Sequence, residues 1–219
     1  WMHVDGAYGA PGALDPRKTG LFAGLERADS VSLDPHKWLY VPVDAGCLLF
    51  RDAATAAVFT EDADYIKLHG HADDAAFAYW DYGVELSRRF RALKVWLTLG
   101  YYGVNRIAQA IADDIALAGY LGELVSQAED FELLAPVELS ICCFRYVPPS
   151  FTGNDDELNK LNEEIMGVVQ KGGRAYLSNA TVNGKFALRA CVTNFRTTKE
   201  DVELTIDVVR DAAKTVGHG

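Results

Sequence analysis

Three short apolar runs stand in the first 52 residues of this 219-residue chain. The runs are Met2–Val4, Ser30–Leu33 and Gly46–Phe50, and Gly, Pro and Asp residues punctuate the stretches between them. Continuous apolar runs of this length are typical of β-strands that are buried in a parallel sheet. The pattern therefore predicts an open α/β sheet, in which ligands bind beyond the carboxyl ends of the strands.

Two residues with useful chemistry follow these runs. Asp5 ends the first run, and Lys37 comes shortly after the second, in Asp34-Pro35-His36-Lys37-Trp38. We expect them to converge at one edge of the sheet. A lysine that forms a Schiff base with an aldehyde and a carboxylate that keeps a proton on a pyridine nitrogen suit a pyridoxal 5′-phosphate site. The alternative is an ordinary solvated lysine. A Schiff-base lysine must be able to lose its proton, and partial burial lowers the pKa of a lysine.

The middle of the chain changes character twice. Residues 53–83 show no clear helical or strand period, which favours a long loop of the kind that often serves as a functional lid. From Glu85 a helical stripe begins, and a second helix follows after Gly103. The apolar positions of the two helices are Leu86, Phe90, Leu93 and Leu97, then Ile107, Ile111, Ile115, Ala118, Leu121 and Val125.

The last third predicts a βαββα-like unit. A strand is expected over Leu139–Val147, and Asn154 with Glu157 has the spacing of a capping box at the start of a helix. Two strands then flank a turn at Asn183-Gly184, and a final helix follows. The expected strands are Ala175–Leu177 and Phe186–Val192, and the final helix is expected to begin at Thr197 with Glu200. The order predicts a small α+β domain.

Charge and hydropathy exclude some classes of function. Lys plus Arg is 21 and Asp plus Glu is 31, so the net charge is −10, which argues against a nucleic-acid partner. No apolar run approaches the roughly 20 residues that span a bilayer, so we expect no membrane partner. The four cysteines lack a metal-ligand spacing and are expected to be free thiols in a reducing cytoplasm: Cys47, Cys142, Cys143 and Cys191.

Four motifs together resemble a known family. His3-Val4-Asp5-Gly6-Ala7-Tyr8 and Asp34-Pro35-His36-Lys37-Trp38 are similar to motifs of the pyridoxal-phosphate-dependent amino-acid decarboxylases of the aromatic-L-amino-acid decarboxylase family (group II, fold type I). The resemblance covers nearly the whole chain, since it continues through Arg88-Arg89-Phe90-Arg91-Ala92-Leu93-Lys94-Val95-Trp96 with Tyr102-Gly103, and through Lys185-Phe186-Ala187-Leu188-Arg189.

The resemblance implies the fold of a fold type I pyridoxal-phosphate-dependent transferase. Residues 1–103 would be the C-terminal part of the large α/β domain that binds the cofactor, with a catalytic loop at about 60–83. Residues 104–219 would be the small C-terminal α+β domain. Because family members are substantially longer, the N-terminal part of the enzyme is expected as a separate chain or cleaved segment, within a homodimer. The first residue, Trp1, fits a fragment, a nicked protein or a split protein.

The resemblance also assigns roles to residues around the cofactor. Lys37 would be the Schiff-base lysine, and Asp5 would pair with the pyridinium nitrogen. Ala7 would lie against the ring, His36 near the phosphate, and Ser32 on the strand approaching the cofactor. The family often has Asn at the position of Asp34, and a carboxylate there would repel phosphate. A side-chain phosphate contact by Asp34 is therefore not expected.

A tyrosine of the loop would complete the chemistry. Tyr79 falls on the family's catalytic loop tyrosine, which protonates the carbon that has lost carbon dioxide, and Tyr82 is the alternative register. Packing by Phe77, Tyr79, Trp80 and Tyr82 is the other interpretation. Relatives with phenylalanine at this position tend towards aldehyde synthesis, so Tyr79 favours plain decarboxylation.

Other charged groups are ambiguous. Arg189 resembles the family position that binds a substrate carboxylate, and an ion pair within the domain is the equal alternative. The cluster Arg88–Arg91 with Lys94 is expected to pair with acids rather than with phosphate. His69 and His71, with Asp73 and Asp74, are expected to form a polar loop rather than a metal site, so no metal is predicted.

The predicted activity is decarboxylation of an L-amino acid to the amine and carbon dioxide. Aromatic amino acids are the first expectation for the substrate, and acidic ones such as glutamate are the second. The alternatives are an aldehyde synthase, another fold type I lyase, and a non-catalytic remnant that only binds partners or a small molecule. The yellow absorbance of a cofactor bound to lysine would distinguish an enzyme from a non-catalytic remnant.

Overall fold

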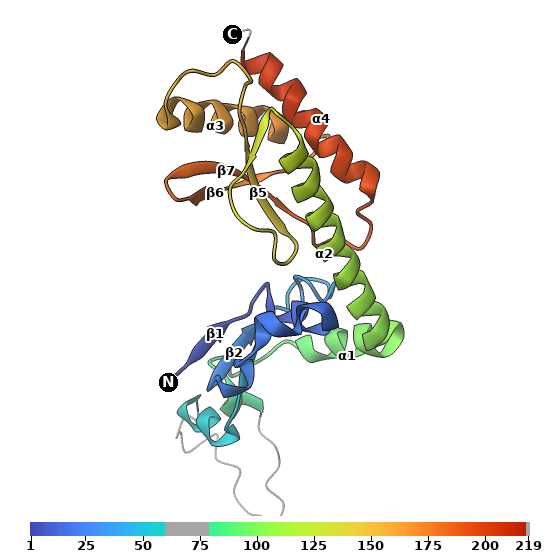
Figure 1. Cartoon of the computed structure of the whole chain (residues 1–219). Coiled ribbons are helices and arrows are strands. Elements are labelled where there is room, and N and C mark those ends of the chain that lie inside the picture. The colour runs from blue at the N-terminus through green and yellow to red at the C-terminus, as the bar shows by residue number, and fades with distance from the viewer. Residues whose placement is uncertain (60–78, 218–219) are drawn as a thin grey trace, which may run out of the picture. The chain divides into compact units, whose positions relative to one another are not determined.

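A computed structural model of the chain describes residues 1–59 and 79–217 (Figure 1), and of Asp81 only the backbone. The chain divides into two compact units. The first comprises Trp1–Ala13 and Arg17–Gly103, and the second comprises Leu14–Pro16 and Val104–Gly219. Each unit is described by itself below. The assignment of residues 1–103 to a larger cofactor-binding domain stays a prediction.

The first unit holds a three-stranded sheet in the order β1-β2-β3. Strand β1 (His3–Asp5) pairs in parallel with β2 (Ser30–Leu33), as expected for an α/β sheet. Strand β3 (Cys47–Phe50) is antiparallel to β2, so the expectation of a parallel third strand was wrong. The reason lies in the connection between them, because it carries turns and lacks the crossover helix that a parallel return usually needs.

Short 3₁₀ helices connect the strands of the first unit. Between β1 and β2 these are η1 (Ala10–Leu14), η2 (Pro16–Phe22) and η3 (Leu25–Arg27). Helices η4 (Ala53–Phe59) and η5 (Tyr79–Tyr82) occupy the two ends of the stretch that was expected to be a long loop. The rest of that stretch, with His69, His71, Asp73 and Asp74, lies outside the described residues.

Helix α1 (Arg91–Tyr102) closes the first unit. It begins six residues after Glu85, where the apolar period predicted its start, so that prediction was wrong. The carboxylate of Glu85 lies 2.8 Å from the guanidinium of Arg91, and this ion pair joins the residues before the helix to its first turn. Gly103 ends the helix with a φ of 76°, a value that glycine adopts at little cost.

The second unit contains a four-stranded antiparallel sheet in the order β4-β5-β7-β6, and helices precede and separate its strands along the chain. Helices α3 and α4 lie side by side against this sheet (Figure 1). The elements are α2 (Val104–Gln127), β4 (Phe131–Leu133), β5 (Ile141–Tyr146), α3 (Asp155–Gly172), β6 (Ser178–Val182), β7 (Lys185–Cys191) and α4 (Lys199–Val216). The predicted βαββα order from β5 to α4 is confirmed.

Two strands of the second unit differ from the prediction. Strand β6 begins at Ser178, so a strand over residues 175–177 was wrong. Strand β4 has only three residues and its apolar run was too short to recognise. The turn at Asn183-Gly184 is confirmed, with φ of 50° and 79°, because both residues take the left-handed conformation that a tight two-residue hairpin requires.

The core of the second unit lies between the sheet and its three long helices. Alternate residues of the central strands face it, namely Cys142 and Phe144 of β5 and Leu188 of β7, all fully buried. The helices contribute apolar stripes to the same cluster: Leu121 and Val125 from α2, Ile165 and Val169 from α3, and Val202, Ile206 and Val209 from α4. All four cysteines are free, and Cys142 is buried while its neighbour Cys143 is half-buried.

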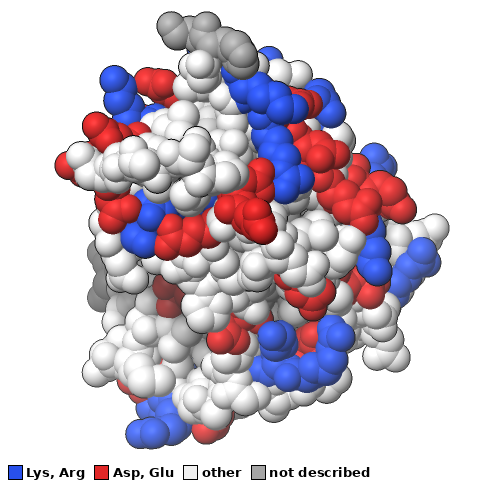
Figure 2. Space-filling view, turned by 45° about the horizontal axis from the view of Figure 1, so that its top comes forward, with Lys and Arg blue, Asp and Glu red and all other residues white. Residues whose placement is uncertain are grey.

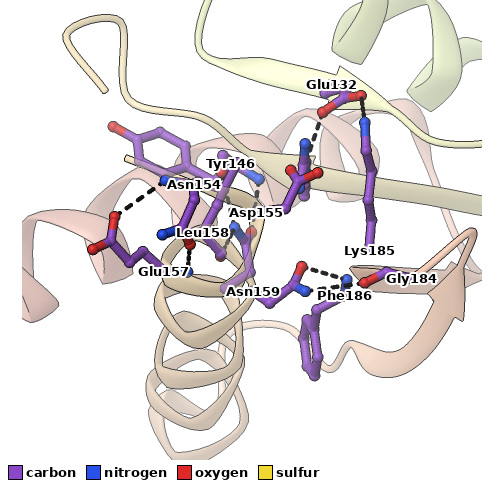
Figure 3. Close-up of polar contacts among 12 residues, drawn as sticks. Glu132, Tyr146, Asn154, Asp155, Glu157, Leu158, Asn159, Gly184, Lys185 and Phe186 are labelled. Atoms are coloured by element: carbon purple, nitrogen blue, oxygen red, sulfur yellow. Dashed lines mark hydrogen bonds and ion pairs between the residues drawn. The ribbon is translucent and has the colours of Figure 1, made fainter. Parts of the chain in front are cut away.

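Polar contacts fix the start of helix α3 (Figure 3). Asn154 accepts a hydrogen bond from the backbone N–H of Glu157, whose carboxylate accepts from the backbone N–H of Asn154, so the predicted capping box is confirmed. Inside the helix, the buried Asn162 bonds both backbone groups of Tyr146 at the end of β5. The second box, at α4, is formed by Thr198 and Asp201, one residue later than predicted.

An ion-pair network ties β4 to β5 and β7 (Figure 3). Glu132 accepts from Nε of Arg145 and from Nζ of Lys185, each at 2.6 Å. Nη1 of the buried Arg145 lies 2.8 Å from Asp155, but the angle between them does not suit a hydrogen bond. The carboxylates of Glu132 and Asp155 stabilise the buried charge of Arg145.

Basic and acidic side chains are interleaved on the face shown in Figure 2, so no broad basic patch forms there. This agrees with the acidic net charge of the chain. None of the helices in the described ranges has the length and the apolar composition needed to cross a membrane.

Candidate active site

The segments that follow β1 and β2 lie against each other. Asp5 stands opposite Ser32 in the parallel register, and the backbone N–H of Asp34 donates to the carbonyl of Ala7 at 3.1 Å. Gly6 permits this approach, because a Cβ at that position would lie 2.8 Å from the carbonyl oxygen of Ser32 and 2.7 Å from Cβ of Ala10. The residues predicted from both segments therefore share one edge of the sheet.

Asp5 carries an oriented carboxylate at this edge. Its Oδ1 accepts hydrogen bonds from the backbone N–H of Ala7 at 3.1 Å and from Oγ of Ser32 at 3.0 Å. These two donors, with smaller contributions from the charges of Lys37 and His3, hold the pKa of Asp5 below its ordinary value. The carboxylate is therefore ionised at neutral pH.

Lys37 follows β2 after a short turn, in which its N–H donates to the carbonyl of Asp34 at 2.9 Å. Its Nζ forms an ion pair with Oδ2 of Asp34 at 2.8 Å, and the side chain is 45% exposed. The next residue, Trp38, is fully buried and stacks on Tyr8 with the ring centroids 5.0 Å apart. The buried tryptophan anchors the turn while the amine of Lys37 stays accessible.

His36 is held by the backbone on the far side of the same turn. Its Nδ1 lies 2.8 Å from the carbonyl oxygen of Ala45 and 3.2 Å from the N–H of Ala45. Either tautomer finds a partner there, since one donates to the carbonyl and the other accepts from the N–H. The ring orientation is thereby set, and Nε2 is the nitrogen left to meet a ligand.

The basic cluster before and within α1 pairs with acids, as predicted. Oδ2 of Asp44 accepts from Nε of Arg91 at 3.0 Å, and Arg89 and Lys94 lie within 3.7 Å of its other oxygen. The guanidinium of Arg91 lowers the pKa of both Asp44 and Glu85. Arg89, Arg91 and Lys94 are therefore paired with carboxylates of their own unit, whereas Arg88 donates to the backbone carbonyl of Tyr79.

Tyr79 and Tyr82 lie at the two ends of η5. The side chain of Tyr79 is largely exposed, and its carbonyl accepts a hydrogen bond from Nη1 of Arg88 at 3.0 Å. The choice between the two tyrosines stays a prediction. Most of the loop expected at about 60–83 lies outside the described residues.

Arg189 belongs to the second unit. It lies in β7 opposite Cys143 and Ser178, and its Nη1 lies 3.3 Å from Oγ of Ser178. No carboxylate of the described chain pairs with it within 4 Å, so the predicted alternative of an ion pair has no support from these contacts. Its role towards a substrate stays a prediction.

Two contacts at the edge were not foreseen. The hydrogen bond from Ser32 to Asp5 requires the parallel register, which short apolar runs do not reveal. The ion pair between Asp34 and Lys37 had a visible signal, because residues three apart in a turn lie close enough to pair. Both contacts involve the groups expected to receive a cofactor.

The arrangement at this edge suits the group that the sequence predicts. Both hydrogen bonds to Asp5 engage Oδ1, and no donor from the described residues reaches Oδ2. An ionised oxygen that is open to a ligand can accept the N–H of a protonated pyridine ring. The accessible amine of Lys37 comes from the neighbouring segment, so the donor set fits pyridoxal phosphate.

Comparisons with known proteins agree with this chemistry. The pyridoxal-dependent decarboxylase conserved domain matches residues 1–147. Among curated proteins, an aromatic-L-amino-acid decarboxylase of Bacillus atrophaeus is 39% identical over 203 residues, covering 92% of this chain and 42% of that protein. A phenylacetaldehyde synthase of a Rosa hybrid cultivar is 32% identical, covering 99% of this chain and 44% of that protein.

Solved structures share the fold. The crystal structure of Oryza sativa TDC with PLP and tryptamine matches with a TM-score of 0.87 and 30% identity, covering 98% of this chain and 44% of that chain. The chain thus spans less than half the length of the relatives that it matches.

Proposed function

The chain belongs to the pyridoxal-dependent decarboxylase family, whose cofactor is pyridoxal 5′-phosphate, and we propose that it forms part of an enzyme that decarboxylates an aromatic L-amino acid to the amine and carbon dioxide. The observation that carries the proposal is the shared edge of β1 and β2, where an oriented carboxylate and an accessible lysine meet. Family membership supports the same chemistry.

Three groups of the first unit would hold the cofactor. Nζ of Lys37 would bond its aldehyde carbon, and Oδ2 of Asp5 would accept the N–H of its ring nitrogen. His36, oriented by Ala45, would turn Nε2 towards its phosphate, and Ala7 offers a small side chain beside Asp5. When bound, the cofactor supplies a ring that accepts the electrons left behind as carbon dioxide departs.

The chain's own residues supply the charge and the proton. Asp5 stays ionised and so favours a protonated ring nitrogen, which strengthens the electron demand where charge develops. Tyr79 would donate its phenolic proton to the carbon that has lost the carboxylate, with Tyr82 as the alternative donor. Arg189 would bind a carboxylate of the substrate.

We propose further that the remaining part of the enzyme covers this edge within a homodimer. Asp5 and Lys37 are both exposed, whereas such chemistry needs water to be excluded. Leu48 and Leu49 of β3 and Trp96 of α1 are also exposed, as expected of surfaces that another segment covers. A cytoplasmic location is part of the same proposal.

The test of this function is Asp5→Asn in the complete enzyme. An amide cannot balance the pyridinium charge, so carbon dioxide release should fall by at least about a hundredfold. The cofactor should remain covalently bound, which its absorbance reports. Asp52→Asn, which removes an exposed carboxylate of the same unit, should leave the rate unchanged. A fully active Asp5→Asn enzyme would remove Asp5 from the chemistry.

A panel of amino acids defines the substrate. Tyrosine, tryptophan, phenylalanine and glutamate should be compared by the rate of carbon dioxide release from the complete enzyme. The proposal expects the aromatic substrates to exceed glutamate clearly. A preference for glutamate would retain the reaction and overturn the substrate class, and no release from any amino acid would favour a non-catalytic protein.

Aldehyde synthesis is the second candidate, since a phenylacetaldehyde synthase is among the relatives. That reaction consumes dioxygen and water with the amino acid and yields the aldehyde, carbon dioxide, ammonia and hydrogen peroxide. A phenolic proton donor favours the amine, because protonation of the carbon then precedes its oxidation. Tyr79 therefore favours the decarboxylase.

Tyr79→Phe decides between the two candidates. We expect the variant to lose most amine and to release aldehyde with hydrogen peroxide in equal amounts. Tyr82→Phe is the matched control, since it removes the same hydroxyl at the other end of η5. Chromatography of products and a peroxide assay give the readout. Unchanged amine from Tyr79→Phe, with loss from Tyr82→Phe, would transfer the role to Tyr82.

A further inference from the structure

We propose that Ser32 is a positioning residue that sets the orientation and the charge of Asp5 from the neighbouring strand, rather than by touching the cofactor. The inference rests on the proposed function, because it assumes that Asp5 faces the ring nitrogen. It gives Ser32 a specific role where the sequence indicated only a general place near the cofactor.

The geometry of the sheet places the two side chains together. Residues that stand opposite each other in neighbouring strands present their side chains on the same face, and Asp5 stands opposite Ser32. Oγ of Ser32 donates to Oδ1 of Asp5 at 3.0 Å. This hydrogen bond is the only one that the Ser32 hydroxyl makes within the described chain.

The second donor to Oδ1 comes from within the same loop. The N–H of Ala7 lies two residues after Asp5, a local turn contact that an aspartate forms on its own. Ser32 differs, because it belongs to β2, which leads into the turn that carries Lys37. The hydroxyl therefore couples the carboxylate on one strand to the strand that positions the lysine.

The two donors to Oδ1 of Asp5 also affect the position of a proton that this carboxylate would share with the ring nitrogen. A proton between a carboxylate and a pyridine nitrogen lies on the nitrogen when the charged carboxylate is stabilised. Ser32 and Ala7 provide that stabilisation, and the charged or titratable groups facing Asp5 are Lys37 and His3. Loss of the hydroxyl would raise the pKa of Asp5 and move the proton towards it.

The experiment compares Ser32→Ala, Ser32→Thr and Ser30→Ala in the complete enzyme loaded with ¹⁵N-labelled pyridoxal phosphate. The ¹⁵N chemical shift reports protonation of the ring nitrogen directly. Ser32→Ala should move the signal towards the unprotonated value and lower kcat about tenfold, the change that one pKa unit represents, with KM within about twofold. Ser32→Thr keeps a hydroxyl, so its ¹⁵N chemical shift and its kcat should both match the wild-type values.

Ser30→Ala is the matched control, because it removes a hydroxyl two residues earlier on β2. Its Oγ contacts Nε1 of Trp1 and Nδ1 of His3 instead of Asp5. The ¹⁵N signal should therefore stay at the wild-type position. If Ser32→Ala fails to fold, Ser32→Cys preserves the volume with a weaker donor and should show a smaller displacement in the same direction.

The outcomes separate this inference from the proposed function. An unchanged ¹⁵N shift in Ser32→Ala, or an equal displacement in Ser32→Thr, overturns the role of Ser32. In that case Asp5→Asn should still abolish activity, and the proposed function stands. If Asp5→Asn keeps full activity, the proposed function itself fails.

Discussion

At the scale of single residues, an ion pair at the site must break before Lys37 can bind a ligand. Lys37 is paired with Asp34 at 2.8 Å, and Asp34 is less exposed than the lysine. Pyridoxal phosphate is an anion, so a carboxylate beside the proposed attachment point would repel it and compete for the amine. The proposed site would therefore bind its cofactor against an opposing charge.

Removal of that charge should strengthen binding. We expect Asp34→Asn to bind pyridoxal phosphate about tenfold more tightly, because the amide neither repels the phosphate nor pairs with the ammonium. The measurement is a titration of the cofactor-free complete enzyme, followed by absorbance. Glu26→Gln is the charge-matched control, since Glu26 precedes β2 whereas Lys37 follows it. Weaker binding by Asp34→Asn would mean that Asp34 supports the cofactor.

At the scale of elements, the sequence predicted helices with marked ends better than strands without them. The capping box of Asn154 and the Asn183-Gly184 turn are local signals, and both lie where they were expected. Strand β4 has no such signal. The antiparallel direction of β3 could not be read either, because an apolar run looks the same in both directions.

The site shows the same division. The motifs identified Asp5 and Lys37 as residues of interest, since Asp5 ends the first strand and Lys37 follows the second. The contact of Ser32 with Asp5 depends on pairing between strands far apart in the sequence, which no single run reveals. The start of α1 was missed because Leu86 and Phe90 continue the apolar period before the helix begins at Arg91.

The cap of α3 gives a prediction at this scale. Asn154→Ala removes the acceptor for the N–H of Glu157 and should lower the free energy of unfolding by about 1 kcal/mol. The thermal midpoint of the complete enzyme should therefore decrease. Glu163→Ala changes an exposed position in the middle of α3 and serves as the control. Equal midpoints for Asn154→Ala and the wild type would show that the cap is dispensable.

At the scale of the whole molecule, the chain covers 42% of the length of its Bacillus atrophaeus relative. The groups that it contributes are a lysine, an ionised carboxylate and an oriented histidine, all at or beside one edge of the first sheet. The lysine and the carboxylate remain exposed in the described chain, so we propose that the rest of the enzyme closes the site and excludes water.

At this scale we propose above all that Lys37 carries the cofactor. The complete enzyme, loaded with pyridoxal phosphate, is reduced with borohydride, digested and analysed by mass spectrometry. We predict a phosphopyridoxyl adduct on Nζ of Lys37, one per chain, and none in a Lys37→Arg variant. An adduct on another lysine, or an unmodified Lys37 in enzyme that releases carbon dioxide, would show that Lys37 does not carry the cofactor.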